Sequence, residues 1–481
     1  MAKFYKSPGV YIQNVGRFPS SIAQVETAIP GFIGRTQWLN GVEAFQPQKI
    51  TSILDYEQYF GTSVPQDFNI KVRVEKQSGN ISNVDVAMVG GAPVHADLVP
   101  KNPMYYAMRL FFDNGGVFCY VVSTGTQTEE GQVNRSDIKK AVEILEHLDE
   151  VTLIASPDAS RLSASDYKSY FSDPVLKQCL KLHDRFGVFD VVGAHSKASA
   201  QTDILSFRTQ TSNITEELKL GAAYFPYLQT GIRILTEDAK ISVEEHKEIN
   251  DGGTAVDSVL QGKRLNNAVF DDHKPVYKAI KNFLDTFCAV MPPSPAIVGV
   301  YAKVDGMHGV WKAPANVSLS SVVAPVFSID NQMTEGLNVD LLSGKSINAI
   351  RQFPGKGILV WGARTLAGND NEWRYISVRR FFNMVEESVK KGTRQFVFEP
   401  NDANTWTKIK ALIENFLVEQ WRAGALAGSK PSHAFFVKVG LGETMTASDM
   451  LNNKMIIEIG MAVVRPAEFI IMRFTHKMHK N

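Results

Sequence analysis

The chain has 481 residues, which is long for one hydrophobic core and favours about three domains. Hydrophobic residues make up 44% and charged residues 21%, the proportions of an ordinary globular protein. With 51 basic and 50 acidic side chains the formal net charge is +1, so the basic excess typical of nucleic-acid binders is missing and we expect no nucleic-acid contact.

Residues 1–24 predict an extended arm rather than a domain. Pro8-Gly9 favours a turn before a short β-branched run, and Pro19 interrupts the segment again. Two interpretations are open: a frayed terminus, or a strand that pairs elsewhere and removes costly apolar side chains from water. The apolar side chains concerned are Tyr5, Val10, Tyr11 and Ile12.

The middle of the chain predicts two segments with different secondary structure. We expect residues 25–100 to form a β-rich segment, because 29–34 is a short apolar run typical of a strand and 61–100 is rich in Val, Asn and Gly with no helical period. Over 101–294 strands alternate with helices, which predicts a mixed or parallel sheet covered by helices, with 235–272 as a polar surface excursion. The proline cluster at 292–295 predicts a domain boundary, and 295–345 would connect to the next domain.

Residues 346–481 predict an α+β domain, so the fold class is a multidomain combination of α+β and α/β parts. Period-two and period-3.6 patterns alternate cleanly through this region. The predicted elements are strands 357–361 and 373–376, helix 378–389 ended by Gly392, strand 396–398, helix 405–423, and strands 435–439, 454–460 and 469–474.

The sequence offers no positive sign of catalysis. Cys119, Cys179 and Cys288 are far apart and form no zinc motif, and the P-loop, Gly-x-Ser-x-Gly and His-Glu-x-x-His patterns are missing. His183 and His195 could line a cleft, although solvated surface histidines are the simpler interpretation. We therefore expect no catalytic, cofactor-binding or metal-binding residues.

Charged residues on two helices admit two interpretations each. Arg379 and Arg380 are either part of a solvated helix face or a contact surface. The same alternatives hold for the polar side of helix 405–423, whose apolar stripe includes Ile409 and Phe416.

Several short sequence segments resemble segments of the contractile tail sheath family, which occurs in contractile phages, tailocins and phage-like injection systems. The resemblance covers about 295–481 and plausibly the N-terminal arm. The segments that carry the resemblance are Phe353-Pro354-Gly355-Lys356-Gly357, Trp361-Gly362-Ala363-Arg364-Thr365, Ser377-Val378-Arg379-Arg380, Phe398-Glu399-Pro400-Asn401 and Pro466-Ala467-Glu468-Phe469-Ile470.

The resemblance implies a structural sheath subunit, in which the C-terminal domain and N-terminal arm form an inner layer and the rest projects outward. Subunits would stack as six-fold rings around an inner tube and contract. The arm and a C-terminal strand (Phe469, Ile470, Ile471, Met472 and Phe474) would be donated to neighbours, and Lys408, Lys410, Glu414 and Glu419 would face the tube.

The implied partners are further copies of the chain, the inner tube protein, and baseplate and terminator or cap proteins. No signal-peptide core occurs in residues 1–8 and no run of about 18 apolar residues predicts a membrane span, so we expect no membrane insertion. Assembly in the bacterial cytoplasm, followed by release as a particle, is expected. Two alternatives stay open: another structural part of the same machine, or an enzyme that uses the α/β region.

Overall fold

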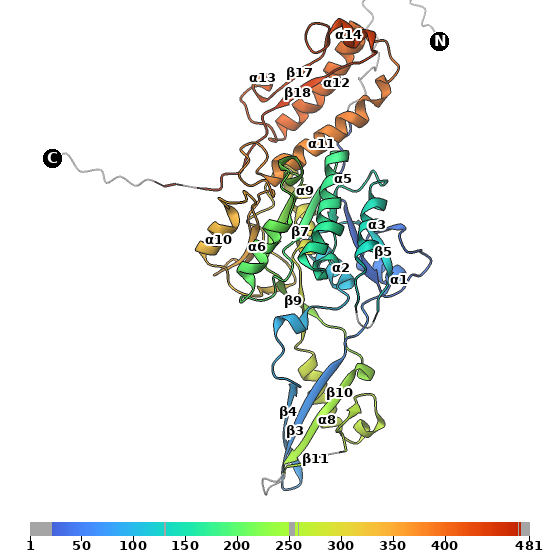
Figure 1. The fold of residues 1–481 in the computed structure, drawn as a ribbon, viewed down its shortest axis with the longest axis vertical. Helices are drawn as coiled ribbons and strands as arrows, with labels where there is room; N and C mark the ends of the chain where they lie inside the picture. The colour runs from blue at the N-terminus through green and yellow to red at the C-terminus, as the bar shows by residue number, and fades with distance from the viewer. Residues whose placement is uncertain (1–21, 129–130, 250–254, 258, 470, 473–481) are drawn as a thin grey trace, which may run out of the picture. The chain divides into compact units, whose positions relative to one another are not determined.

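The computed structural model describes residues 22–128, 131–249, 255–257, 259–469 and 471–472 (Figure 1). The chain divides into two compact units. The C-terminal unit contains Val385–Val464 and the described residues up to Val25, and the main unit contains Glu26–Met384 and the described residues from Arg465 onward.

The main unit is built on an eight-stranded sheet. Its order is β16-β15-β8-β7-β6-β1-β5-β2, with six parallel strands in the centre and an antiparallel strand at each edge. The strands are β1 (Pro30–Thr36), β2 (Pro47–Ile50), β5 (Cys119–Thr126), β6 (Leu153–Ala155), β7 (Phe186–Asp190), β8 (Gly221–Phe225), β15 (Asn348–Phe353) and β16 (Gly357–Trp361).

Helices cover both faces of this sheet. Alternate strand residues point to opposite sides, so Phe32 joins one buried cluster and Ile33 the other. The first cluster includes α2 (Met104–Asp113) and α9 (Ser294–His308); the second includes α3 (Arg135–Leu145), α5 (Asp173–Leu182) and α6 (Ala200–Gln210). The predicted sheet covered by helices is confirmed.

The sheet does not follow the domain boundaries expected from the sequence. β1 and β2 come from the expected β-rich segment, and β15 and β16 come from the expected C-terminal domain. The proline cluster follows β13 directly and includes the first two residues of α9, inside the main unit. These strands belong to one sheet because their backbones pair with strands far away in the chain, as Asn348 of β15 does with Tyr224 of β8.

A second sheet, which we call the β insertion, takes β3 and β4 from the expected β-rich segment and its other strands from residues 241–264. Its order is β11-β10-β3-β4, and β12 also pairs with β10. The strands are β3 (Phe68–Gln77), β4 (Asn80–Met88), β10 (Ile241–Ile249), β11 (Ala255–Asp257) and β12 (Lys263–Arg264), and α8 (Lys274–Leu284) contributes to the same core. Residues 235–272 are therefore not only a surface excursion, since Ile241 and Val243 are buried against that core.

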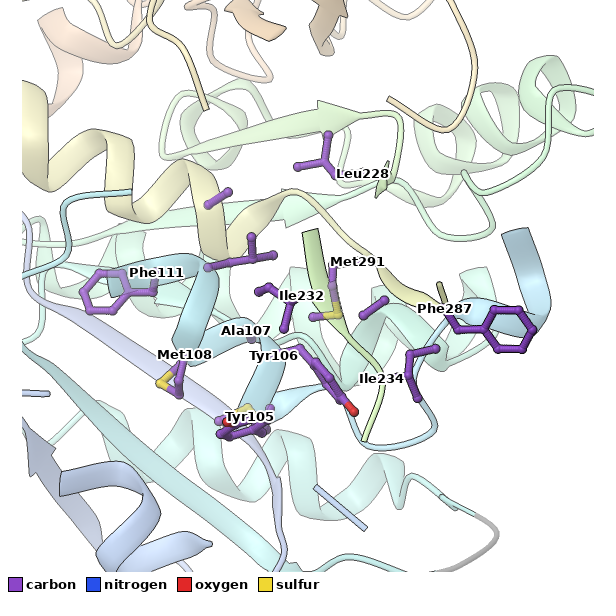
Figure 2. Packing of buried hydrophobic residues seen from close by; sticks show 14 of the residues in the cluster. Tyr105, Tyr106, Ala107, Met108, Phe111, Leu228, Ile232, Ile234, Phe287 and Met291 are labelled. Carbon is purple, nitrogen blue, oxygen red and sulfur yellow. The ribbon is translucent and has the colours of Figure 1, made fainter. Parts of the chain in front are cut away.

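A third, three-stranded sheet, β13-β9-β14, joins this core to the rest of the main unit. Figure 2 shows Tyr106 of α2 close to Ile232 of β9 and Met291 of β13, and Phe111 farther along the same cluster. The strands are β9 (Leu228–Arg233), β13 (Cys288–Met291) and β14 (Val322–Pro325). One continuous cluster of apolar side chains thus runs from the large sheet into the β insertion.

Short helices complete the main unit. They are α1 (Ile53–Phe60), η1 (His95–Leu98), η2 (Ala159–Arg161), α4 (Ala164–Tyr167), η3 (Lys168–Ser172), α7 (Thr215–Leu218), η4 (Asp238–Lys240), η5 (Ala268–Asp271) and α10 (Asn331–Asn338). Helix α11 (Ile376–Thr393) contains residues of both units.

The C-terminal unit combines a long helix with a small sheet. Its further elements are η6 (Arg394–Phe396), α12 (Ala403–Arg422), α13 (Pro431–Ala434), β17 (Phe435–Lys438), α14 (Ala447–Leu451) and β18 (Glu458–Met461). The predicted helix 405–423 and strand 435–439 are confirmed within one or two residues. The strand expected over 454–460 is present only at its end.

Two predicted strands are wrong. At 373–376 the Asp370 carboxylate accepts hydrogen bonds from the backbone amides of Glu372 and Trp373, at 2.7 and 2.8 Å, and this turn leads directly into α11. At 396–398 the chain makes a 3₁₀ turn, and Phe398 has a φ of 71°, which a strand cannot contain.

Gly392 does not end α11 as expected, because the helix continues to Thr393. A Cβ atom at position 392 would lie 2.6 Å from Cγ1 of Ile22. The glycine therefore permits the close approach of the N-terminal segment within the C-terminal unit, rather than a helix stop.

Candidate assembly interface

The sheet of the C-terminal unit has only two strands. β17 and β18 pair antiparallel with Phe435 opposite Met461 and Lys438 opposite Glu458. Within the described residues neither strand pairs with a third strand. Such a ribbon is marginal alone, and its unpaired edges are ready to accept further strands.

One face of this ribbon is covered by α12. The helix begins at Asp402, whose carboxylate accepts the Thr405 amide at 2.9 Å, and this bond lowers the pKa of Asp402. Its buried stripe contains Ile409, Leu412, Ile413, Phe416 and Leu417. In contrast Phe436 of β17 keeps 44% of its surface exposed. The helix thus supports the ribbon while leaving apolar strand surface uncovered.

The four charged residues expected to face a tube form two pairs rather than one surface. At 100° per residue, Lys408 and Glu419 lie about 20° apart on one flank of the buried stripe, and Lys410 and Glu414 lie about 40° apart on the other. Lys408 and Glu419 are exposed, and Lys410 and Glu414 are half-buried. Each flank therefore carries one basic and one acidic residue.

The N-terminal segment enters the C-terminal unit beside α11 and α12. The Val25 amide donates to Ser388 Oγ at 3.1 Å, and Gln420 Nε2 donates to Gln24 Oε1 at 3.2 Å. The expected arm residues Tyr5, Val10, Tyr11 and Ile12 lie outside the described residues. Their role stays a prediction.

The C-terminal segment returns to the main unit and is anchored there by an ion pair. Arg364 donates from Nε to Glu468 Oε1 at 2.8 Å and from Nη2 to Glu468 Oε2 at 2.5 Å. The two side chains are only 4% and 17% exposed. Hydrogen bonding to Glu468 raises the pKa of Arg364. A bidentate, buried pair of this kind fixes the position from which the last residues leave.

Beyond this anchor the chain presents apolar side chains to solvent. Phe469, Ile471 and Met472 are 72%, 81% and 72% exposed, and none of the three belongs to a strand. Ile470 and Phe474, the other members of the expected donated strand, lie outside the described residues. Exposed apolar residues in sequence, next to a rigid anchor, are typical of a segment that a partner covers.

Arg379 and Arg380 are not part of a solvated face. Arg380 forms a bidentate pair with Asp305, at 2.6 and 3.1 Å, and lies over the Tyr301 ring. Arg379 lies 4.5 Å from the Trp373 ring centre. Both arginines are less than 5% exposed, so they are structural.

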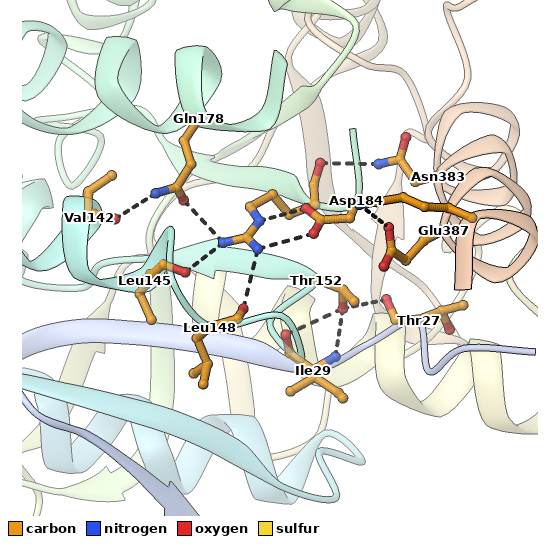
Figure 3. Close-up of polar contacts among 12 residues, drawn as sticks. Thr27, Ile29, Val142, Leu145, Leu148, Thr152, Gln178, Asp184, Asn383 and Glu387 are labelled. Atoms are coloured by element: carbon orange, nitrogen blue, oxygen red, sulfur yellow. Dashed lines mark hydrogen bonds and ion pairs between the residues drawn. The ribbon is translucent and has the colours of Figure 1, made fainter. Parts of the chain in front are cut away.

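The same part of α11 is tied to the large sheet. Figure 3 shows Asn383, whose side-chain amide donates to the Arg185 carbonyl at 3.1 Å. The Arg185 guanidinium in turn donates to the carbonyls of Leu145 and Leu148 at the end of α3. Sequence reasoning missed this network because its members are spread over more than two hundred residues.

The α/β region contains a cleft of about 760 Å³ at the carboxyl ends of the parallel strands, lined in part by Arg161, His195 and Tyr227. Arg161 is engaged with the carbonyls of Lys101 and Gly131. Nearby, burial raises the pKa of Asp158 to about 6, while this carboxylate accepts the Arg35 amide at 2.6 Å. These charged groups hold loops together.

His183 lies elsewhere, as the residue that ends α5, with a φ of 60°. Within the described residues, no group of three or more His, Cys, Asp or Glu side chains could hold a metal ion. No helix of the described chain is long and apolar enough to cross a membrane.

Comparison with known proteins identifies the C-terminal region. Residues 368–477 match the phage tail sheath C-terminal domain family. The tail sheath protein of Enterobacteria phage T4 is 23% identical over 128 residues, which cover 26% of this chain and 19% of that protein. The tail sheath protein of Burkholderia phage BcepMu is 28% identical over 145 residues, 29% of this chain and 30% of that protein. The matched part thus spans less than a third of these curated relatives.

Solved structures extend the likeness to the whole chain. The sheath complex of the extracellular contractile injection system PVC, in its contracted state, has a TM-score of 0.62 at 27% identity and covers 99% of both chains. The contracted helical sheath of the anti-feeding prophage has a TM-score of 0.63 at 29% identity and covers 98% of this chain and all of the other. The chain therefore carries a region that matches the phage tail sheath C-terminal domain family, and it resembles contractile injection system sheaths over nearly its whole length.

Proposed function

We propose that this chain is the sheath subunit of a contractile injection machine. It polymerises as a helical stack of six-fold rings around an inner tube and contracts to drive the tube through a target envelope. The observation that carries this proposal is the unfinished β17–β18 ribbon in a chain that also exposes an anchored apolar C-terminal segment. The likeness to contracted sheaths over nearly the whole chain supports it.

Strand donation links the subunits in this proposal. The C-terminal segment of one copy and the N-terminal arm of another add to the open edges of β17 and β18. Backbone hydrogen bonds supply affinity in such augmentation, and side chains such as Phe469 and Ile471 supply register. The Arg364–Glu468 pair fixes the donor so that only the residues beyond it need to find the neighbour.

Contraction then needs no nucleotide. The extended sheath is metastable and is held by its contacts with the tube and baseplate, and the arms keep subunits linked while their bodies move into new contacts. Stored free energy becomes mechanical work, in keeping with the missing P-loop in the sequence. The chain is not an enzyme in this proposal, and it contacts neither nucleic acid nor membrane lipid.

The remaining partners follow from the same assembly. One flank of α12 faces the inner tube through polar contacts that are individually weak and therefore breakable. The ends of the sheath meet a baseplate and a terminator or cap protein. Assembly takes place in the bacterial cytoplasm, and the finished particle acts outside the cell.

A second candidate is a sheath-like subunit that belongs to the baseplate end of the same machine. The 6-fold symmetrised baseplate of the anti-feeding prophage includes a chain 29% identical to this one, with a TM-score of 0.61. Such a subunit would join the first ring but would not polymerise without the baseplate.

Electron microscopy of the purified chain tests the proposal. We expect hollow, striated tubes of uniform diameter from the full chain, with or without co-expressed tube protein. Deletion of residues 1–20 should leave a folded monomer, shown by an unchanged circular dichroism spectrum, that forms no tubes. Tubes at normal yield from the deletion variant would contradict the arm mechanism. Only monomers from the full chain, even with tube protein, would contradict the sheath function and favour the baseplate candidate.

A further inference from the structure

The C-terminal unit carries an exposed apolar projection between η6 and α12, which we call the knob and define as Val397 and Phe398. Val397 is 63% exposed and Phe398 is fully exposed. Phe398 has a φ of 71°, a left-handed conformation that is a genuine outlier for a bulky side chain. Such conformations persist only where the surroundings enforce them, and they concentrate at functional sites.

The knob is held firmly from both sides. The Val397 amide donates to the Arg394 carbonyl at 3.2 Å, and the Glu399 amide donates to the Phe396 carbonyl at 3.1 Å. Asn401 then joins this loop to the Lys454 carbonyl and to Trp406 Nε1, at 3.0 and 2.7 Å. A rigid aromatic side chain loses little conformational entropy on binding, so the knob is pre-organised as an anchor.

The main unit carries a depression, which we call the hollow. It lies between α6, α10 and the loop that follows α10, and has a volume of about 670 Å³. Ile204 and Leu337, both less than 6% exposed, form part of its lining, and Leu341 and Leu342 on its rim are 89% and 96% exposed. This volume falls in the range of ordinary binding pockets.

The rim is also fixed in place. Asp340 accepts the Ser343 amide at 2.8 Å, its carbonyl accepts Asn369 Nδ2 at 3.0 Å, and its carboxylate lies 3.7 Å from Arg208 Nη1. The two leucines therefore point outward from an ordered loop. Two adjacent, nearly fully exposed leucines on an ordered loop are unfavourable in water unless a partner covers them.

We propose that the knob of one copy inserts into the hollow of a neighbouring copy. This inference rests on the sheath assembly proposed above and assigns one of its contacts. Knob and hollow are different surfaces of one chain, so the contact is heterologous and can propagate as a helix instead of closing a dimer. The exposed apolar side chains of the knob and of the rim suit a contact between copies better than the polar contact with the tube.

Cross-linking tests this pairing directly. Cys119 and Cys179 are buried, so a Cys288→Ser background leaves no accessible thiol within the described residues. Phe398→Cys and Leu342→Cys variants, assembled together and treated with a short bis-maleimide, should give a covalent dimer. Either variant assembled alone should give no covalent dimer after the same treatment. Leu54→Cys, at a position 71% exposed on α1, is the matched control for Leu342→Cys and should give no dimer with Phe398→Cys.

Charge substitutions supply the second measurement. Phe398→Glu and Leu342→Lys should each raise the protein concentration needed for tube formation by about tenfold or more, and the double variant should recover part of that loss. Both sites are exposed, so each monomer should keep the circular dichroism spectrum and melting temperature of the unmodified chain.

The outcomes separate this inference from the function on which it rests. If the unmodified chain forms tubes but both single variants do so equally well and no mixed dimer appears, the knob and hollow do not pair. A Phe398→Cys dimer that forms equally well with Leu54→Cys would overturn the pairing too. Failure of the unmodified chain to form tubes under any condition contradicts the proposed function itself.

Discussion

The large sheet of the main unit and the small ribbon of the C-terminal unit differ in completeness. The large sheet has helices on both faces, and its antiparallel edge strand β16 is further bridged to Ser318. Its other edge strand, β2, is four residues long and contains a proline and a lysine, which discourage further pairing. The ribbon has two four-residue strands, and β17 also carries a lysine, Lys438, but among the described residues neither strand pairs with a third strand and neither contains a proline.

The two regions also treat charge differently. In the main unit Arg364, Arg380 and Arg185 are buried, and each is engaged by several oxygen acceptors. On α12 the charged side chains flank the buried stripe, and they are exposed or half-buried rather than fully buried. One unit is thus completed within the chain, whereas the other leaves strand edges unpaired and charged side chains uncovered among the described residues.

Removing a buried arginine from the main unit should give the largest loss of unfolding free energy among these predictions. Arg380→Met leaves Asp305, whose side chain is 7% exposed, without its cation. An uncompensated buried charge costs about 3–5 kcal/mol of unfolding free energy. Chemical denaturation followed by circular dichroism should show this loss.

The double variant Arg380→Met with Asp305→Leu is the control. Replacing both partners by apolar groups is close to neutral, so most of the stability should return. A single variant as stable as the unmodified chain would mean that the pair is solvated and not a structural feature of the main unit.

Acidification should change the stability of the main unit by an intermediate amount. The main unit contains buried titratable groups whose contributions to stability change in opposite directions as the pH falls. Burial lowers the pKa of His246 on β10, whose ring nitrogens have no hydrogen-bond partner among the described residues. The unfolded chain binds this proton near pH 6.5, before the folded chain does. Stability from neutral His246 is therefore fully present above pH 6.5 and is lost as the pH falls toward the folded value.

Asp190 acts in the opposite direction. Burial raises its pKa to about 7, although two hydrogen bonds from Ser294 oppose that rise. The folded chain holds a proton that the unfolded chain releases between pH 7 and about 3.8, so this group gains stability as the pH falls through that window.

Melting temperatures of His246→Leu and Asp190→Asn measured from pH 8 to pH 4 separate the two contributions. Relative to the unmodified chain, His246→Leu should become more stable with acidification and Asp190→Asn less stable. Parallel curves for all three proteins would show that neither group titrates differently on folding.

Local patterns in the sequence were sufficient for elements with one buried face. Ile409, Leu412 and Phe416 recur at helical spacing and place α12 within two residues, and the apolar run at 358–360 places β16. They failed where a side chain bends the backbone, as Asp370 does before α11, and where Phe398 adopts a left-handed conformation. Neither feature has a periodic signature.

Long-range pairing explains the remaining differences. Arg364 and Glu468 each lie in a phrase resembling the sheath family, but nothing local indicates that they meet across 104 residues. In the same way β1 and β15 join one sheet through partners that lie far away in the chain. The expected tube-facing set stays a prediction, because charge and exposure are local properties but the flank of a helix that meets a partner is not.

Charge reversal on α12 should give the smallest effect and assign that flank. In one variant Lys408→Glu is combined with Glu419→Lys, and in the other Lys410→Glu is combined with Glu414→Lys, so net charge stays constant. Exposed pairs contribute up to about 1 kcal/mol each, so folding should be unchanged while co-sedimentation with tube protein weakens and becomes less salt-sensitive. Because the two flanks lie on opposite sides of the buried stripe, only one variant should show the loss. Equal tube binding by both variants and the unmodified chain would contradict the tube-facing assignment of this helix.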